Sequence, residues 1–166
     1  MSACSRLRDC YSEVAINPVE VAMSRYEVTI FPRHASDPVN AVLDSGLYLN
    51  DLVRIEHEWS GDRETIREKL IKGNIPKDLW PESLCWDFVD KANKLRPYEN
   101  EYSVAGIMCE QQWQGAMIFR NGDSVLGNTG QLIYVEYFEV APWNWKDLEQ
   151  IEWQQRFRRV GSILFL

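Results

Sequence analysis

Residues 131–166 read QLIYVEYFEVAPWNWKDLEQIEWQQRFRRVGSILFL, and this stretch decides how the rest of the chain is interpreted. An apolar run with β-branched and aromatic residues reaches Pro142, and a polar connector follows. The segment Arg158-Arg159-Val160-Gly161-Ser162 then opens a second apolar run. The first run predicts a strand and the second predicts the start of a helix. A strand followed by arginines, a glycine and a helix start is an order typical of phosphate-binding sites.

The residues around Gly161 have the features that an anion site needs. The first N–H groups of a helix have no partner inside the helix, and the helix dipole places partial positive charge beside them. Glycine lets the backbone approach an anion, and arginine adds a forked, permanently charged donor. We therefore expect the amides of residues 159–162, assisted by Arg158, to bind a phosphate group. In the alternative interpretation, the arginines form a solvated helix face or balance the acidic residues of the connector, which are Asp147, Glu149 and Glu152.

At these residues the chain resembles the GNAT superfamily of acetyl-CoA-dependent N-acyltransferases. The family pattern joins an apolar strand ending in Leu-x-Val-x-Pro to Arg/Gln-x-x-Gly-x-Gly/Ala at a helix N-terminus. This chain has Phe138-Glu139-Val140-Ala141-Pro142 for the first part and Arg158-Arg159-Val160-Gly161-Ser162-Ile163 for the second. It departs from the pattern at Ile163, where the family has a small residue. It also has fifteen residues between Pro142 and Arg158, where the family usually has only a few.

The resemblance implies acetyl-CoA as cosubstrate and an amine as acetyl acceptor. The amides of Arg159, Val160, Gly161 and Ser162 would hold the pyrophosphate with help from Arg158. The pantetheine arm would pair, like an added strand, with the segment Phe138-Glu139-Val140. The N–H of Val140 would bind the oxyanion, because a bulge or splay in family strands turns this amide away from the neighbouring strand.

Glu136 is the first candidate for the base that removes the amine proton. Two-residue spacing places Tyr134, Glu136, Phe138 and Val140 on one face of the expected strand. A carboxylate among aromatic rings loses hydration, which raises its pKa in the direction that a general base needs. The alternative is a Glu136 that faces water on a half-solvated sheet. Glu139 points to the other face and is the second candidate.

Composition limits the remaining function classes. The 166 residues fit one domain, and 45% hydrophobic content is enough for a core. A net charge of −7 makes nucleic-acid binding unfavourable and is compatible with an amine substrate. The four cysteines and two histidines show neither a disulfide framework nor zinc-ligand spacing, so we expect no metal. No apolar run is long enough to span a membrane, and no secretory signal is evident, so we expect a cytoplasmic protein.

The rest of the chain predicts an α+β fold of the GNAT-like kind, with an antiparallel or mixed sheet and flanking helices. Residues 1–20 are expected to form a flexible arm and residues 21–166 a single GNAT-like domain. Expected strands lie at 26–31, 102–109, 114–119 and 132–140, and expected helices at 63–72, capped by Asp62, and at 81–95. The pattern from 36 to 59 is ambiguous and favours a helix. Within the connector, Trp143, Trp145 and Trp153 are expected to be apolar anchors rather than an aromatic wall for an amine.

Relative to the family, we expect a domain truncated at its C-terminal end. The family's next strand, last helix and last hairpin have no counterpart before Leu166. Ile133, Val135 and the apolar end at 163–166 would then lack a covering layer, and a protein partner or a second copy could cover them. This gives the alternative function, a noncatalytic GNAT-like module that docks a partner through its C-terminal surface.

Overall fold

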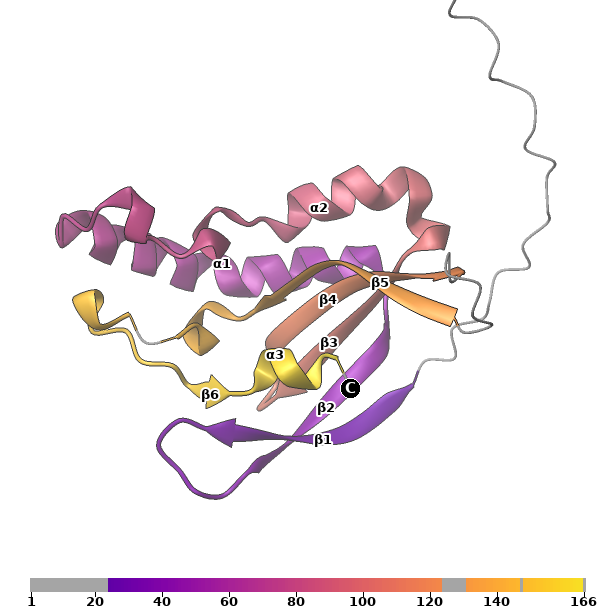
Figure 1. Cartoon of the computed structure of the whole chain (residues 1–166), viewed down its shortest axis with the longest axis horizontal. Coiled ribbons are helices and arrows are strands. Elements are labelled where there is room, and N and C mark those ends of the chain that lie inside the picture. The colour runs from indigo at the N-terminus through magenta and orange to yellow at the C-terminus, as the bar shows by residue number, and fades with distance from the viewer. Residues whose placement is uncertain (1–23, 124–130, 147, 166) are drawn as a thin grey trace, which may run out of the picture.

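The computed structural model describes residues 24–123, 131–146 and 148–165 (Figure 1). The arm expected at 1–20 lies outside the described residues. At the centre is a curled six-stranded sheet in the order β5-β4-β3-β2-β1-β6, in which all paired strands are antiparallel. The strands are β1 (Arg25–Pro32), β2 (Val39–Leu47), β3 (Ser103–Cys109), β4 (Gln112–Asp123), β5 (Gln131–Val140) and β6 (Phe157–Arg158). The predicted α+β class is therefore confirmed.

Two longer helices lie over one face of the sheet, and a short one lies over the other (Figure 1). The helices are α1 (Leu49–Lys72), α2 (Phe88–Leu95) and α3 (Val160–Ile163). Short 3₁₀ segments occupy the connections, at η1 (Lys77–Leu79), η2 (Glu82–Cys85), η3 (Arg96–Glu101), η4 (Pro142–Asn144) and η5 (Glu149–Ile151). None of the helices in the described part of the chain combines the length and apolar character needed to cross a membrane.

Apolar side chains on the two sheet faces form separate cores. Leu52, Ile55 and Trp59 of α1 pack with Phe88 of α2 against the face of Ile118. On the other face, Ile107 and Met117 pack with side chains of β6 and α3, namely Phe157, Val160, Ile163 and Leu164. The short C-terminal segment therefore closes the second core, and the expectation that the apolar end at 163–166 lacks a covering layer is wrong for Ile163 and Leu164.

The helix favoured for residues 36–59 is wrong in its first half. Residues 39–47 form β2, which pairs with both β1 and β3, and only then does α1 begin. The alternation of Val53, Ile55, His57 and Trp59 belongs to α1, because Ile55 and Trp59 lie four residues apart on its buried stripe.

The expected helix boundaries near 62 and 81 also move. Asp62 is inside α1 rather than at a helix start, since α1 runs through the exposed Gly61, where no atom lies within 4 Å of an added Cβ. The helix expected from residue 81 begins at Phe88, because the Asp87 carboxylate accepts hydrogen bonds from the N–H groups of Val89 and Asp90.

Candidate functional site

The C-terminal end of β5 and the first turn of α3 lie directly against each other. A Cβ built on Gly161 would meet Phe138 Cε2 at 3.6 Å and Val140 Cγ1 at 3.7 Å. Phe138 also meets Phe165 edge to face, with ring centroids 5.2 Å apart. The two sequence segments that resemble the GNAT pattern are therefore neighbours in space, although fifteen residues separate them.

The connector between these two segments folds back on itself through main-chain hydrogen bonds. The main chains of Leu148 and Trp153 form an isolated bridge, and the Arg156 N–H returns to the Trp143 carbonyl at 2.7 Å. Trp143 and Trp145 are buried, and Trp153 donates from its indole to the Pro142 carbonyl at 3.1 Å. The three tryptophans thus act as apolar anchors of the connector, as predicted.

A network of hydrogen bonds from buried side-chain amides fixes this connector to the sheet. The Gln114 side chain is fully buried and accepts hydrogen bonds from Trp143 Nε1 at 2.8 Å and Asn144 Nδ2 at 2.9 Å. It donates to the carbonyls of Cys109 and Gln112. Asn144 Oδ1 in turn accepts from the Phe157 N–H at 3.0 Å. The network therefore joins β4, η4 and β6, and β6 leads into α3.

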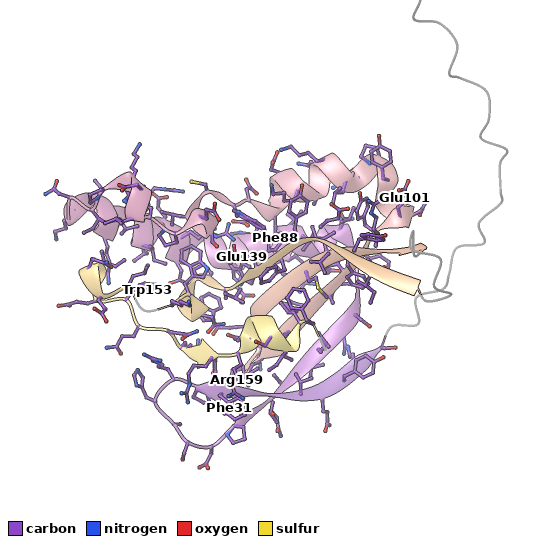
Figure 2. All side chains as sticks on the ribbon, in the orientation of Figure 1. Phe31, Phe88, Glu101, Glu139, Trp153 and Arg159 are labelled. Carbon is purple, nitrogen blue, oxygen red and sulfur yellow. The ribbon has the colours of Figure 1, made fainter. Side chains whose placement is uncertain are left out.

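The first turn of α3 is open to solvent on one side. Ser162 is exposed and Gly161 half-buried, whereas Val160 is buried. The helical hydrogen bonds begin with Ile163 N–H to the Arg159 carbonyl, so the amides of residues 160–162 precede the first of them. Arg159 adopts a left-handed conformation at φ 64°, and its guanidinium lies over the Phe31 ring (Figure 2).

The contacts of Arg156, Arg158 and Arg159 differ from those of the alternative interpretation, in which these arginines balance the charges of the acidic connector residues. Arg156 pairs with Glu110 at 2.7 Å and with Gln112 at 2.6 Å, both at the turn between β3 and β4. Arg158 is exposed, and its Nη2 lies 3.5 Å from the Pro32 carbonyl oxygen. Arg158 and Arg159 are both exposed, and their guanidinium groups lie at the end of β1, beside the Pro32 carbonyl and the Phe31 ring.

β5 is an edge strand, and side chains occupy the outward main-chain groups at its end. The Ala141 N–H bonds the Gln114 carbonyl, so the N–H and C=O of Val140 point to the open side. The Val140 N–H donates to Glu139 Oε1 at 2.9 Å, and the Val140 carbonyl accepts from Trp145 Nε1 at 3.1 Å. A ligand oxygen at the Val140 amide must therefore replace the Glu139 carboxylate.

A bulge separates the residues that were expected to share one face of β5. The pairing shifts between Ile118 and Phe119, and Phe138 pairs with Met117 while Tyr134 pairs with Arg120. Met117 and Arg120 are an odd number of residues apart on β4, so they face opposite sides of the sheet. The expectation that Tyr134 shares a face with Phe138 is thus wrong.

The two candidate bases have different surroundings. Glu136 is at the bulge, and its carboxylate pairs with Arg120 Nε at 3.0 Å, with 32% of the side chain exposed. Glu139 is only 5% exposed and receives the Val140 N–H and Trp145 Nε1. Burial raises the pKa of the Glu139 carboxyl, against the lowering effects of the Ser83 and Val140 hydrogen bonds and the Arg63 charge. The desolvated environment expected for Glu136 is therefore found at Glu139.

An open groove of about 530 Å³ lies along this end of β5. One wall is formed by the segment between α1 and α2, and the others by the β5 edge and the connector. Its larger lining side chains are apolar: Leu79, Trp80, Trp86, Phe138, Trp145 and Leu148. Glu139, which is 5% exposed, is also among the residues that line this groove.

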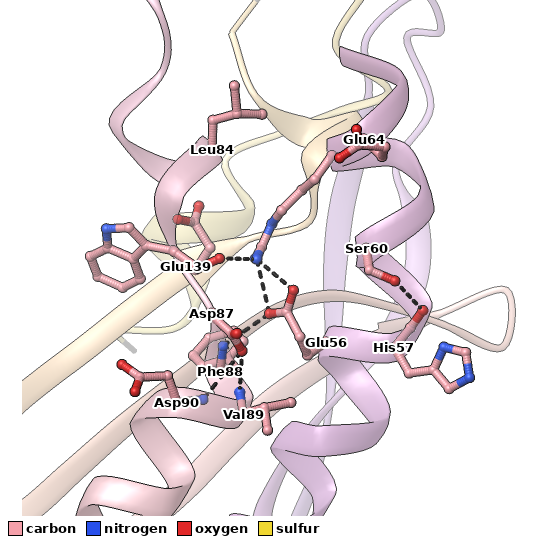
Figure 3. Close-up of polar contacts among 12 residues, drawn as sticks. Glu56, His57, Ser60, Glu64, Leu84, Asp87, Phe88, Val89, Asp90 and Glu139 are labelled. Atoms are coloured by element: carbon pink, nitrogen blue, oxygen red, sulfur yellow. Dashed lines mark hydrogen bonds and ion pairs between the residues drawn. The ribbon is translucent and has the colours of Figure 1, made fainter. Parts of the chain in front are cut away.

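Sequence reasoning missed a buried arginine that pairs with Glu56, which lies close to Asp87 and Phe88 at the start of α2 (Figure 3). Arg63 of α1 is 4% exposed, and its Nη1 donates to both Glu56 carboxylate oxygens, at 2.7 and 2.9 Å, and to the Trp86 carbonyl. Its Nε and Nη2 have no hydrogen-bond partner in the described structure. A charged residue on an otherwise apolar helix stripe was the available signal, because Arg63 follows Trp59 by four residues and precedes Ile66 by three.

Comparison with protein-family models, with curated proteins and with solved structures gives no match. Within the described ranges, no group of three or more His, Cys, Asp or Glu side chains is placed to hold a metal ion.

Proposed function

We propose that this chain is a GNAT-like domain that binds acetyl-CoA and transfers the acetyl group to an amine. The observation that carries the proposal is the contact of Gly161 with Phe138 and Val140. Amides that precede the first helical hydrogen bond of α3 thus lie beside the outer edge of β5, where Glu139 and Trp145 now occupy the main-chain groups of Val140. A diphosphate on those amides and an extended pantetheine arm along that edge would then form one continuous ligand site.

The position of the helices agrees with the proposal. Two helices cover one face of an antiparallel meander, and α3 starts on the other face after the last strand of the meander. Arg158 and Arg159 are exposed near the α3 start and could pair with phosphate oxygens.

In the proposed reaction, the amine nitrogen attacks the thioester carbonyl carbon, and the C–S bond breaks. The carbonyl oxygen takes the Val140 N–H that now serves Glu139. Glu139, once released, accepts the proton that the amine nitrogen loses. CoA leaves as the thiolate and takes a proton from solvent. Glu139 fits this role better than Glu136, because it is buried and lies at the same amide.

A second candidate function is partner docking through the open β5 edge. Its specific support is the exposure of apolar side chains there and just after α3: Ile133 is 62% exposed, Phe165 55% and Phe138 44%. A partner strand could pair with this edge, because an edge strand presents unpaired main-chain groups.

Calorimetric titration with CoA tests the first proposal. We expect saturable one-to-one binding that Gly161→Glu weakens by at least about tenfold, equivalent to about 1.4 kcal/mol, because a carboxylate would then face the diphosphate. Val140 and Phe138 leave ordinary contact distances at this position, so the variant should fold.

Gly61→Glu is the matched control, because it adds the same charge at an exposed site on α1 with nothing within 4 Å. It should leave CoA affinity unchanged. Equal CoA affinity in both variants, or no CoA binding to the unmodified chain, would contradict the proposal and favour partner docking.

A further inference from the structure

We propose that the groove beside the β5 edge takes an amine with an apolar, aromatic-sized body, its ammonium group at Glu139 and its body against the groove tryptophans. In calling this amine the acetyl acceptor, the inference rests on the proposed function. The binding site itself is argued from the groove.

The groove has the size and lining for a small organic molecule. Its volume of about 530 Å³ lies within the usual range for ligand sites. Its aromatic lining residues are Trp80, Trp86, Phe138 and Trp145. Such rings stabilise apolar ligands by burial and stacking. A purely polar amine would leave these surfaces without a partner.

The ammonium position follows from the partners of Glu139. The hydrogen bonds to this buried carboxylate come from neutral donors, the Val140 N–H, the Trp145 indole and the Ser83 side chain. The Arg63 charge also acts on Glu139, but the hydrogen bonds of Arg63 go to Glu56 and to the Trp86 carbonyl. A ligand cation in the groove would supply a direct charge partner, and such pairing stabilises a desolvated carboxylate.

The other charges of the groove permit a cation. Its lining holds Glu82 as well as Glu139, and Lys146 as a cation. Among the residues that line the groove, two carboxylates therefore stand against one cation.

The tryptophans are better suited to the body of the ligand than to its charge. Lys77 Nζ lies 6.0 Å from the Trp80 ring centroid, and Lys91 Nζ lies 5.4 Å from the Trp86 ring centroid. These rings already carry a cation of the chain on one face. Glu139 is therefore the group at which the ligand's ammonium would be stabilised most by charge pairing.

Binding of three probes to the full chain without CoA tests the inference. 2-Phenylethylamine has both features, 2-phenylethanol lacks the charge, and putrescine lacks the aromatic body. Calorimetry and tryptophan fluorescence excited at 295 nm should show 2-phenylethylamine binding at least about tenfold more tightly than either of the others. Equal affinity for the amine and the alcohol, or no binding of the amine, would overturn the inference.

Glu139→Gln is the decisive variant, because it keeps the side-chain volume and an acceptor for the Val140 N–H. It should remove the tenfold preference for 2-phenylethylamine while leaving 2-phenylethanol affinity unchanged, which also reports that the groove is still folded. Glu99→Gln, an exposed change on η3, is the charge control and should preserve the preference. An unchanged preference in Glu139→Gln would sink the inference.

Competition by CoA separates this inference from the proposed function. CoA should bind together with 2-phenylethylamine, whereas mutual exclusion would assign the groove to the pantetheine arm and overturn the amine site. If the amine binds as expected and CoA does not bind at all, the acyltransferase proposal fails while the amine site stands. If CoA binds and 2-phenylethylamine does not, the reverse holds.

Discussion

Replacing Arg63 by alanine should lower the free energy of unfolding by about 3–5 kcal/mol. The change leaves the Glu56 carboxylate, whose side chain is 12% exposed, with a single remaining donor, the Phe88 N–H at 3.0 Å. It also leaves the Trp86 carbonyl without the Arg63 donor. Removing one partner of a buried ion pair is costly because the other charge stays desolvated. Urea unfolding followed by circular dichroism measures the loss.

Lys94→Ala is the control for this experiment. Lys94 pairs with Asp90 at 2.7 Å on the surface of α2, and the two side chains are 64% and 50% exposed. Solvent screens such a pair, so its loss should cost no more than about 0.5 kcal/mol. If Arg63→Ala proves equally mild, the Glu56–Arg63 pair is not the connection between α1 and the start of α2 that the structure indicates.

A double variant, Glu56→Gln with Arg63→Ala, should be more stable than the sum of the two single losses predicts. The second substitution removes the charge that the first leaves unpaired, and residues in direct contact do not contribute additively. Additive losses would show that the two side chains contribute to stability independently. The cost of Arg63→Ala would then come from packing alone.

The strands could be predicted where the residue pattern fits a strand and no other element. Residues 102–109 and 132–140 are apolar or alternating between turn residues, and they form β3 and β5 to within a residue. The segment 36–59 has a strand followed at once by a helix, separated only by Tyr48. A window that covers both elements averages two periods, so the boundary was not recoverable from periodicity.

The sequence predicted which segments form the candidate site, but it did not predict which side chains of β5 share a face of the sheet. The stretch containing Phe138 and the one containing Gly161 meet, and the sequence pattern had already joined them. The bulge opposite Ile118 depends on which residues pair across two strands, and the sequence of β5 alone does not contain that information. This is why Glu136 was favoured over Glu139. Arg63 is different: its place on the apolar stripe of α1 could have been read directly.

Replacing Gln114 by leucine should cost about 3–5 kcal/mol, although the two side chains are close in volume. The substitution leaves the buried Trp143 Nε1 and the carbonyls of Cys109 and Gln112 without their partner. Each buried polar group left without a partner costs about 1–3 kcal/mol. Gln112→Leu is the matched control, since its amide oxygen only accepts from the exposed Arg156 and should matter by less than about 1 kcal/mol.

The Gln114→Leu variant should also weaken CoA binding under conditions in which it is still folded. Asn144 loses its side-chain acceptor on Gln114, and Asn144 holds the Phe157 N–H of β6. β6 is followed by Arg159 and the first turn of α3, so α3 would no longer be fixed on Phe138 and Val140. Hydrogen exchange should speed up in residues 157–164, and CoA affinity should fall with it. Faster exchange with unchanged affinity would mean that the position of α3 on β5 is not what binds the ligand, and the proposed cofactor site would have to be abandoned.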